Sequence, residues 1–600
     1  MIRPKAIASR LLLVVGLLIF SALALALAAG AAETKGTYDP WAWSRKNLNP
    51  TWMEWGKAYW PTQPVRGGYF RRAAQTYIGL MNPNHWPVND WVSISYFYEG
   101  RMMYNGEYRQ RNPWLVESWE FVNPTTVLET YKRGVQFHDG TPMNAHSLKY
   151  LVDWIGDRRN GCWSRGMLKR FSSIEVVDEY TIKWTTKTPW GSYPAGIMGF
   201  LISPKALAGD VLILEAKEAE GEARRLQQKA EQSGKEEDRA AARTAAEAAR
   251  KVAEAAKAKK STDQYPVGTG PFMLEEAKPG NYLKVKRNPN WWFGRSIGRP
   301  EMPYFDGILV TIIPDPSIQL ANLKAGKIDT MDMSKAQYDI VKKDPNLRVH
   351  TFLDNNTTLL LFNQAKGPLQ DIRVRQAVSH ALSRKALVAG AQFGLAREAS
   401  SIYPSDHWAH NPKLEPVLYN PALSKKLLAE AGYAQGLTIK GTSYSDPGSD
   451  TVAQAVKHML AQVGIDWQVQ ALDPVAVSDR MKNLEYEMSL FGQPYIQDPD
   501  GPATAIYHPE GGFHFGRSKN DKIFALIEAG RSEIDETKRQ KIYFDLEKAL
   551  YDDYSDVWLW WNVAVVAYRK NVEGWNNDMW IKDRTLYSSS HPLWFKNGRP

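Results

Sequence analysis

The chain has 600 residues, enough for at least two domains with separate cores, and a formal net charge of +10. Three of the basic residues lie within the first ten positions and no Lys/Arg stripe concentrates the others, which argues against a nucleic-acid-binding protein. The single cysteine, Cys162, excludes an intramolecular disulfide and a CxxC-type metal or redox site.

The first 32 residues predict a signal peptide. A basic start precedes an apolar run from Leu11 to Ala29, and small residues up to Ala32 suit a signal peptidase. A permanent membrane anchor is the alternative, because the run is about long enough to span a bilayer, but its Ala-rich end favours cleavage. No cysteine lies near the cleavage site for lipid attachment. We therefore expect a free periplasmic protein.

Residues 67–204 have the pattern of a mixed α/β region, with a strand expected at 126–131 and a helix at 145–154. Between residues 207 and 260 the composition changes to Ala, Glu, Lys, Arg and Gln, with small apolar residues in alternating steps of three and four. A Gln-Ser-Gly turn at 232–234 divides the two halves of this pattern. The sequence thus predicts an antiparallel helical hairpin, which is either a tolerated surface insertion or a docking element.

After residue 268 the α/β character resumes and continues into a second lobe of βα-type units. The expected strands are 272–274, 282–285, 308–313, 437–439, 467–472 and a buried strand at 557–568, and the expected helices are 317–325, 420–432 and 451–464.

Several separated motifs resemble those of one bacterial family. They are PWLVESWE at 113–120, RGVQFHDGTP at 133–142, VGTGPF at 267–272, KRNPNWW at 286–292, LKAGKID at 323–329 and DIRVRQA at 371–377. Individually these motifs are best explained by turns and core packing. Together, in this order, the chain resembles the extracellular solute-binding proteins of the peptide, dipeptide and nickel class (family 5), the periplasmic components of ABC importers.

The resemblance implies an α/β fold of two hinge-connected lobes, a type II periplasmic binding protein of the large class with an extra subdomain and, here, a helical hairpin insertion. The expected division is a signal peptide at 1–32, lobe I at 33–353 with the extra subdomain at about 85–200 and the hairpin at 207–262, lobe II at 354–492, and a return to lobe I with a C-terminal tail at 493–600.

If the resemblance holds, two regions face the ligand between the lobes. The candidate ligand-binding residues are Asn82, Trp86, Tyr96 and Tyr98 in the first region, Gln493, Tyr495 and Asp498 in the second, and Trp408. Peptide-binding members place an aspartate where Tyr495 stands, to pair with the amino terminus of the peptide. Asp498 could substitute, although a turn-capping role suits it better, and most of the aromatic rings would serve equally well in a core.

We expect a solute-binding receptor that captures a short peptide, with an oligosaccharide or another non-peptide solute as the alternative. No enzymatic activity is expected, since neither a GxSxG nor an HExxH motif is present and the 11 histidines have no metal-ligand spacing. No cofactor and no metal are expected. The expected partners are the ligand and an inner-membrane ABC permease complex, and we expect a monomer. A third class, a chaperone acting through the hairpin, would lose its function when residues 207–262 are removed.

Overall fold

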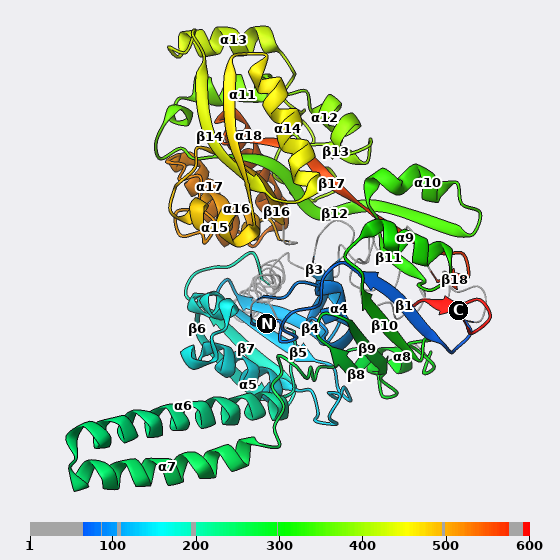
Figure 1. Ribbon diagram of the computed structural model, residues 1–600, viewed down its shortest axis with the longest axis vertical. Helices are drawn as coiled ribbons and strands as arrows, with labels where there is room; N and C mark the ends of the chain where they lie inside the picture. The colour runs from blue at the N-terminus through cyan, green and yellow to red at the C-terminus, as the bar shows by residue number, and fades with distance from the viewer. Residues whose placement is uncertain are drawn as a thin grey trace, which may run out of the picture.

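A computed structural model describes residues 64–85, 87–104, 110–193, 200–296, 298–494, 498–574 and 592–599. The predicted signal peptide lies outside the described residues. The described chain forms two lobes, one above the other in Figure 1, and an 11-stranded mixed sheet runs through both.

The sheet has the order β15-β14-β16-β12-β17-β11-β1-β10-β9-β8, with β13 added beside β17. Its strands are β1 (Tyr69–Ala74), β8 (Phe272–Lys278), β9 (Tyr282–Arg287), β10 (Gly307–Ile312), β11 (Thr330–Asp332), β12 (Leu347–Phe362), β13 (Ala396–Glu398), β14 (Leu437–Tyr444), β15 (Ile465–Leu472), β16 (Met488–Pro494) and β17 (Asp556–Arg569). The six predicted strands in this sheet all form, because each combines apolar alternation with β-branched or aromatic residues.

The two long strands β12 and β17 pair antiparallel and pass from one lobe into the other. On the first-lobe side β17 also pairs with β11, and on the second-lobe side β12 also pairs with β16. The register between β12 and β17 shifts between Leu353 and Thr357, just after β12 passes from the first-lobe core, which Val349 packs against, to the second-lobe core, which contains Leu353. Since a register shift bends the ladder locally, the segment from Val349 to Thr357 is the natural hinge.

The first lobe adds a separate sheet of order β4-β5-β7-β6 to its half of the large sheet. This sheet lies inside the range 85–200 assigned to the extra subdomain. Its side chains share one apolar core with the strands of the main sheet, so the subdomain is fused to the first lobe. The additional elements of the first lobe are α4 (Trp91–Phe97), β2 (Met102–Tyr104), β3 (Gln110–Pro113), β4 (Val116–Asn123), β5 (Thr126–Tyr131), α5 (Ala145–Gly156), β6 (Phe171–Asp178), β7 (Thr181–Thr186), α8 (Trp292–Ser296), α9 (Pro316–Lys324), α10 (Tyr338–Lys342), β18 (Val572–Glu573) and β19 (Trp594–Phe595).

The second lobe packs helices on both faces of its part of the sheet. Successive residues of β12 enter different cores: Leu360 and Phe362 join one, and Leu359 and Leu361 join the other. This alternation follows from the two-residue period of a strand. The helices are α11 (Ile372–His380), α12 (Arg384–Ala391), α13 (Pro421–Glu430), α14 (Pro447–Ala461), α15 (Pro474–Lys482), α16 (Asp500–Tyr507), α17 (Asp521–Ser532) and α18 (Glu536–Asp552).

The predicted return to the first lobe at residue 493 needs correction. Helices α16, α17 and α18 bury Ile506, Ile527 and Leu546 in the same core as Leu359 and therefore belong to the second lobe. The chain returns later, through β17, and reaches the first-lobe core again with β18 and β19.

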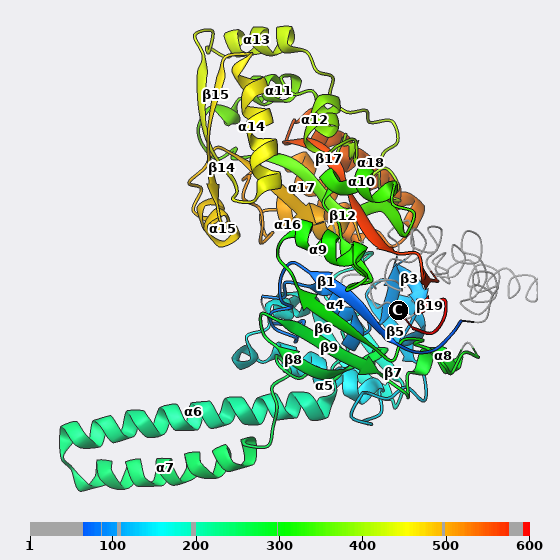
Figure 2. The ribbon, with the colours of Figure 1, turned by 45° about the vertical axis from the view of Figure 1, so that its right-hand side comes forward.

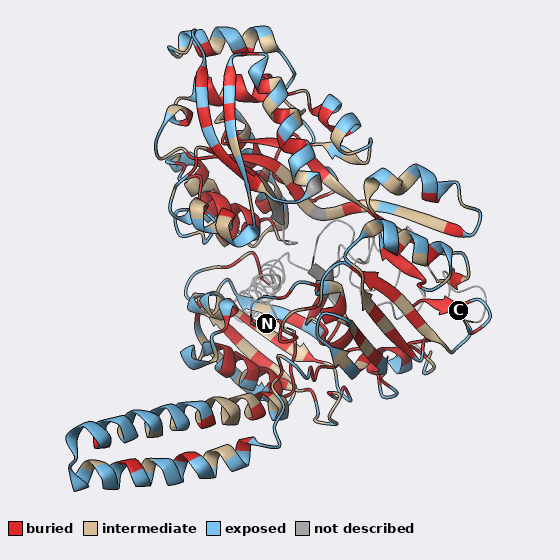
Figure 3. Cartoon of the chain, in the orientation of Figure 1, coloured by how far each residue is buried: buried red, intermediate tan, exposed pale blue. Residues whose placement is uncertain are grey.

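Residues 204–256 form the predicted helical hairpin from α6 (Pro204–Ser233) and α7 (Glu236–Ala256). Gly234 ends α6 in the left-handed region at φ 65°, which glycine adopts without strain. Beyond the base of the hairpin, where Leu207 and Gly209 are buried, the buried residues of both helices are alanines: Ala216, Ala230, Ala242, Ala249 and Ala256. Figure 3 shows the outer surface of both helices largely exposed, and Figures 1 and 2 show the hairpin projecting from the first lobe.

Excising residues 220–249 and joining the ends with a short Gly-Ser turn should shift the thermal midpoint of the remaining protein by less than about 3 °C. The contacts that fix the hairpin to the lobe lie near its base, where Asp210 accepts a hydrogen bond from the Thr262 N–H (2.9 Å) and Glu218 faces Arg159 (3.9 Å). Differential scanning calorimetry checks this. A drop of ten degrees or more would mean that the distal hairpin stabilises the lobe.

Candidate ligand-binding site

The predicted first-lobe residue Asn82 is a structural residue of the loop that it belongs to. Its side chain is fully buried and donates from Nδ2 to the Thr262 hydroxyl (2.8 Å), while Oδ1 accepts from the Asn84 N–H (2.9 Å). The first bond ties the loop to the base of the helical hairpin, and the second lies within the loop. The neighbouring candidate Trp86 lies outside the described residues.

Tyr96 and Tyr98 also lie inside the first lobe, with exposed fractions of 0% and 1%. Both belong to its apolar core, and Tyr96 packs edge-on against Phe272 with ring centroids 6.0 Å apart. Burial raises the pKa of the Tyr96 phenol to about 12. In this conformation the two rings stabilise the lobe and offer no exposed face to a ligand.

The second-lobe candidates lie near the end of β16. The backbone of Gln493 pairs with Thr357 of β12, beside the hinge, and Tyr495 lies outside the described residues. Trp408 is 7% exposed and packs at right angles against Tyr543, with ring centroids 6.0 Å apart. It therefore forms part of the second-lobe core.

Asp498 is paired with a buried arginine. Its Oδ1 and Oδ2 accept hydrogen bonds from Nη2 and Nη1 of Arg539 at 2.6 and 2.7 Å, a bidentate arrangement. Burial by itself lowers the pKa of Arg539, but the carboxylate of Asp498 outweighs this and the net shift is upward. The same guanidinium lies 5.5 Å from the Trp408 ring. The structure thus brings together Asp498 and Trp408, through Arg539, and does not bring them to Asn82, Tyr96 or Tyr98.

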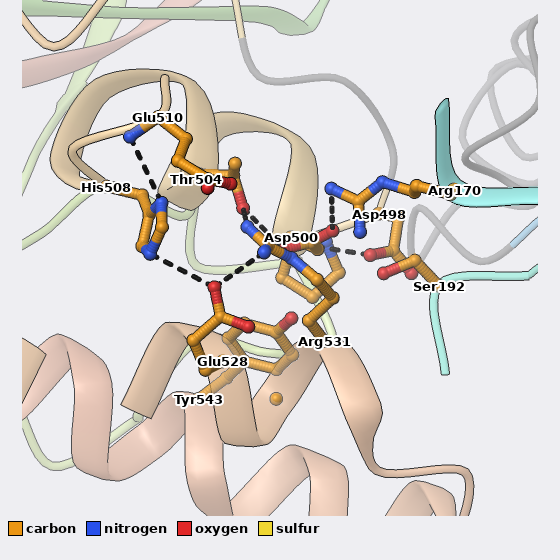
Figure 4. A network of polar contacts seen from close by, with 12 residues as sticks. Arg170, Ser192, Asp498, Asp500, Thr504, His508, Glu510, Glu528, Arg531 and Tyr543 are labelled. Carbon is orange, nitrogen blue, oxygen red and sulfur yellow. Dashed lines mark hydrogen bonds and ion pairs between the residues drawn. The ribbon is translucent and has the colours of Figure 1, made fainter. Parts of the chain in front are cut away.

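A second ion pair lies next to the first, and Figure 4 shows its residues Asp500 and Arg531 beside Asp498. Arg531 donates to Asp500 (3.2 Å), to Glu528 (2.6 Å) and to the Thr504 hydroxyl (2.6 Å). Each carboxylate near the end of β16 that the structure describes is therefore compensated by an arginine from α17 or α18. A cationic ligand group would have to displace one of these arginines.

Sequence reasoning missed Arg539, although a signal was present. The buried residues Arg539, Tyr543, Leu546 and Leu550 follow helical steps of four, three and four along α18. An arginine on an apolar helical face needs a charged partner, because an unpaired buried charge is costly. That argument predicts a buried ion pair without indicating which carboxylate completes it.

Within the described ranges, no group of three or more His, Cys, Asp or Glu side chains is arranged to hold a metal ion. Nor does any helix of this part of the chain have the length and apolar character needed to cross a membrane.

Residues 110–513 match the family model described as "Bacterial extracellular solute-binding proteins, family 5 Middle". Among curated proteins, the glutathione-binding protein GsiB of Escherichia coli (strain K12) is 27% identical over 387 residues, which cover 63% of this chain and 64% of GsiB. This match spans less than two thirds of GsiB. The oligopeptide-binding protein AppA of Bacillus subtilis (strain 168) is 24% identical over 477 residues, which cover 74% of this chain and 77% of AppA.

Solved structures share the fold. AppA from Bacillus subtilis has a TM-score of 0.70 at 21% identity, covering 89% of this chain and 100% of its own. DppA from Helicobacter pylori has a TM-score of 0.68 at 20% identity, covering 89% and 99%.

The two lobes, the pair of crossing strands and these matches define a two-lobed binding protein of type II, as predicted. The chain belongs to the bacterial extracellular solute-binding proteins, family 5. The family description and the names of these relatives are those of binding proteins and not of enzymes.

Proposed function

We propose that this chain is a periplasmic receptor that captures a short peptide between its two lobes and delivers it to an inner-membrane ABC permease. Family membership supports the receptor role. The names of its relatives support the peptide: GsiB is a glutathione-binding protein and AppA an oligopeptide-binding protein. The related AppA and DppA structures were solved in complex with a nonapeptide and with the peptide STSA.

The observation that carries the proposal is the hinge. Strands β12 and β17 connect the lobes and shift register between Leu353 and Thr357, just after β12 crosses between the two cores, so one lobe could rotate against the other by small backbone changes in the segment from Val349 to Thr357. A ligand held by both lobes would favour the closed arrangement by its differential affinity for it. The closed surface would then be the form that the permease recognises.

The ion pair of Asp498 favours a second candidate, an oligosaccharide or another non-peptide solute. Tyr495 stands at the position where the family resemblance implies an amine-binding aspartate, and Arg539 occupies both carboxylate oxygens of Asp498. A peptide ligand would have its ammonium group held elsewhere, for example by backbone carbonyls. Other structural relatives were solved with non-peptide solutes, NikZ of Campylobacter jejuni with Ni(L-His) and AgaA with agropinic acid.

Native mass spectrometry of the protein purified from its periplasm tests the proposal. The expected result is one additional mass that, after release under denaturing conditions, is sequenced as a short peptide. Recovery of a sugar, of a metal chelate or of another non-peptide solute overturns the peptide assignment and favours the second candidate. A preparation that carries no solute and binds neither a di- to nonapeptide library nor a sugar panel in calorimetry contradicts the receptor role itself.

A further inference from the structure

The two lobes contact each other directly through backbone and side-chain groups of the chain. The backbone N–H of Gly191, in the first lobe, donates to the carbonyl of Arg531 at the end of α17 (2.7 Å). Beside it, Nη2 of Arg539 donates a hydrogen bond to the hydroxyl of Ser192 (2.9 Å). These two residues lie 347 positions apart in the sequence. Figure 4 shows Arg170 and Ser192 of the first lobe facing Asp498 and Asp500 of the second.

The first-lobe side of the contact is rigidly anchored. Gly191 and Ser192 lie between Trp190 and Tyr193, which are 4% and 3% exposed and belong to the first-lobe core. Trp190 packs edge-on against Phe171 of β6, with ring centroids 5.6 Å apart. The short segment between these two anchors therefore presents its backbone N–H and its hydroxyl at a fixed position on the lobe surface.

The second-lobe side is equally well positioned. The bidentate pairing with Asp498 and a hydrogen bond from its Nε to the Gly530 carbonyl (2.8 Å) fix the guanidinium of Arg539. Its exposed fraction is 4%, and that of Ser192 is 2%, so water is largely excluded from the bond between them. Asp498 therefore contributes to this contact indirectly, because it orients the guanidinium of Arg539.

The contact requires a glycine at position 191. A Cβ atom there would lie 1.7 Å from the backbone oxygen of Glu533, far inside van der Waals contact. The φ angle of Gly191 lies outside the left-handed region, so the backbone itself does not require a glycine here. Alanine would thus be tolerated by the first lobe alone and clashes only with the second lobe.

We infer that Gly191 and Ser192 of the first lobe, together with Arg531, Glu533 and Arg539 of the second, form an interlobe latch that holds the lobes together without ligand. The latch adds a closing free energy that belongs to the chain itself. It therefore sets the fraction of closed molecules before any solute binds, and with it the apparent affinity of whatever solute prefers the closed form. That last consequence rests on the proposed receptor function, whereas the latch itself does not.

The test measures the distance between the lobes in protein freed of bound solute. Spin labels are attached at V177C in β6 and V475C in α15, positions 56% and 70% exposed, in a C162S background, and electron double resonance gives the distance distribution. The labelled protein with an unsubstituted latch should show a population of molecules with a short distance between the two labels. Gly191→Ala should reduce this population roughly tenfold, because the added methyl cannot be accommodated.

Two further variants complete the test. Gly166→Ala is the matched control, since a Cβ atom at this exposed first-lobe glycine meets nothing within 4 Å, and it should leave the distribution unchanged. Ser192→Ala removes one hydrogen bond and adds no bulk, so it should reduce the short-distance population roughly threefold, even if Gly191→Ala fails to fold. The latch is overturned if the unsubstituted protein shows only a long distance between the labels. It is also overturned if the distance distributions of Ser192→Ala and Gly191→Ala are both identical to that of the unsubstituted protein. Because no solute takes part, this result is independent of whether the ligand is a peptide.

Discussion

Replacing Asp498 with asparagine should lower the free energy of unfolding by about 3 kcal/mol. The substitution keeps the shape of the side chain but leaves the guanidinium of Arg539, only 4% exposed, without its bidentate anionic partner. Breaking a buried ion pair from one side is costly, because the remaining charge has lost its water and its counter-charge. Chemical denaturation followed by circular dichroism measures the change.

The matched control is Asp545→Asn on α18. Asp545 pairs with Lys541 at 2.9 Å, one helical turn away, but its side chain is 53% exposed, so the same chemical change should cost well under about 1 kcal/mol. If Asp498→Asn instead leaves stability unchanged and abolishes solute binding, Asp498 is a ligand group and its pairing with Arg539 is replaced when ligand binds. The two outcomes separate a structural carboxylate from an amine-binding one.

Much of the secondary structure follows from local pattern. The helical hairpin is predicted from an alternating three- and four-residue spacing, and the structure buries alanines of that spacing, such as Ala216 and Ala249. The strand predicted at 557–568 is observed as β17, Asp556–Arg569. In both cases the information lies within a single element, because its periodicity shows which residues are buried.

The division between the lobes could not be read in the same way. The amphipathic pattern of α17 and α18 shows that each helix has an apolar face, but it does not show which sheet that face covers. The prediction assigned residues beyond 493 to the first lobe, whereas Ile527 and Leu546 pack beside Leu359 in the second. Only the long-range pairing of β17 with both β12 and β11 determines where the chain crosses.

The candidate site shows the limit of reasoning from residue type. Tyrosine carries an apolar ring and a polar hydroxyl, so Tyr96 and Tyr98 suit a ligand surface and a core equally well, and the structure places them in a core. Conversely, Gly191 and Ser192 have no chemical signature in the sequence. Their role depends on Arg531 and Arg539, more than 300 residues away, and no local pattern reports such a contact.

The stability of the first lobe should depend on pH through Glu99. This carboxylate is 7% exposed and accepts hydrogen bonds from the indole N–H groups of three tryptophans, Trp114 (3.0 Å), Trp291 (3.0 Å) and Trp292 (2.9 Å). Burial raises its pKa from the ordinary 4.5 to about 7, and the indole hydrogen bonds only partly oppose this shift. At this site the cost of removing the carboxylate from water outweighs the three indole hydrogen bonds.

Because the folded-state pKa exceeds the unfolded one, the folded protein binds this proton more tightly. The stabilisation from Glu99 is therefore present below pH 4.5, declines as the pH rises from 4.5 to 7, and is absent above. The change amounts to about 3 kcal/mol. Glu99→Gln cannot ionise, so the difference in unfolding free energy between the unsubstituted protein and this variant should fall by about 2.5 kcal/mol between pH 5 and pH 8. Urea unfolding monitored by tryptophan fluorescence at both pH values gives this difference, in which the contributions of the other titrating groups cancel.

A difference in unfolding free energy that stays constant with pH would contradict the prediction. It would mean that the indole cluster solvates the carboxylate as well as water does.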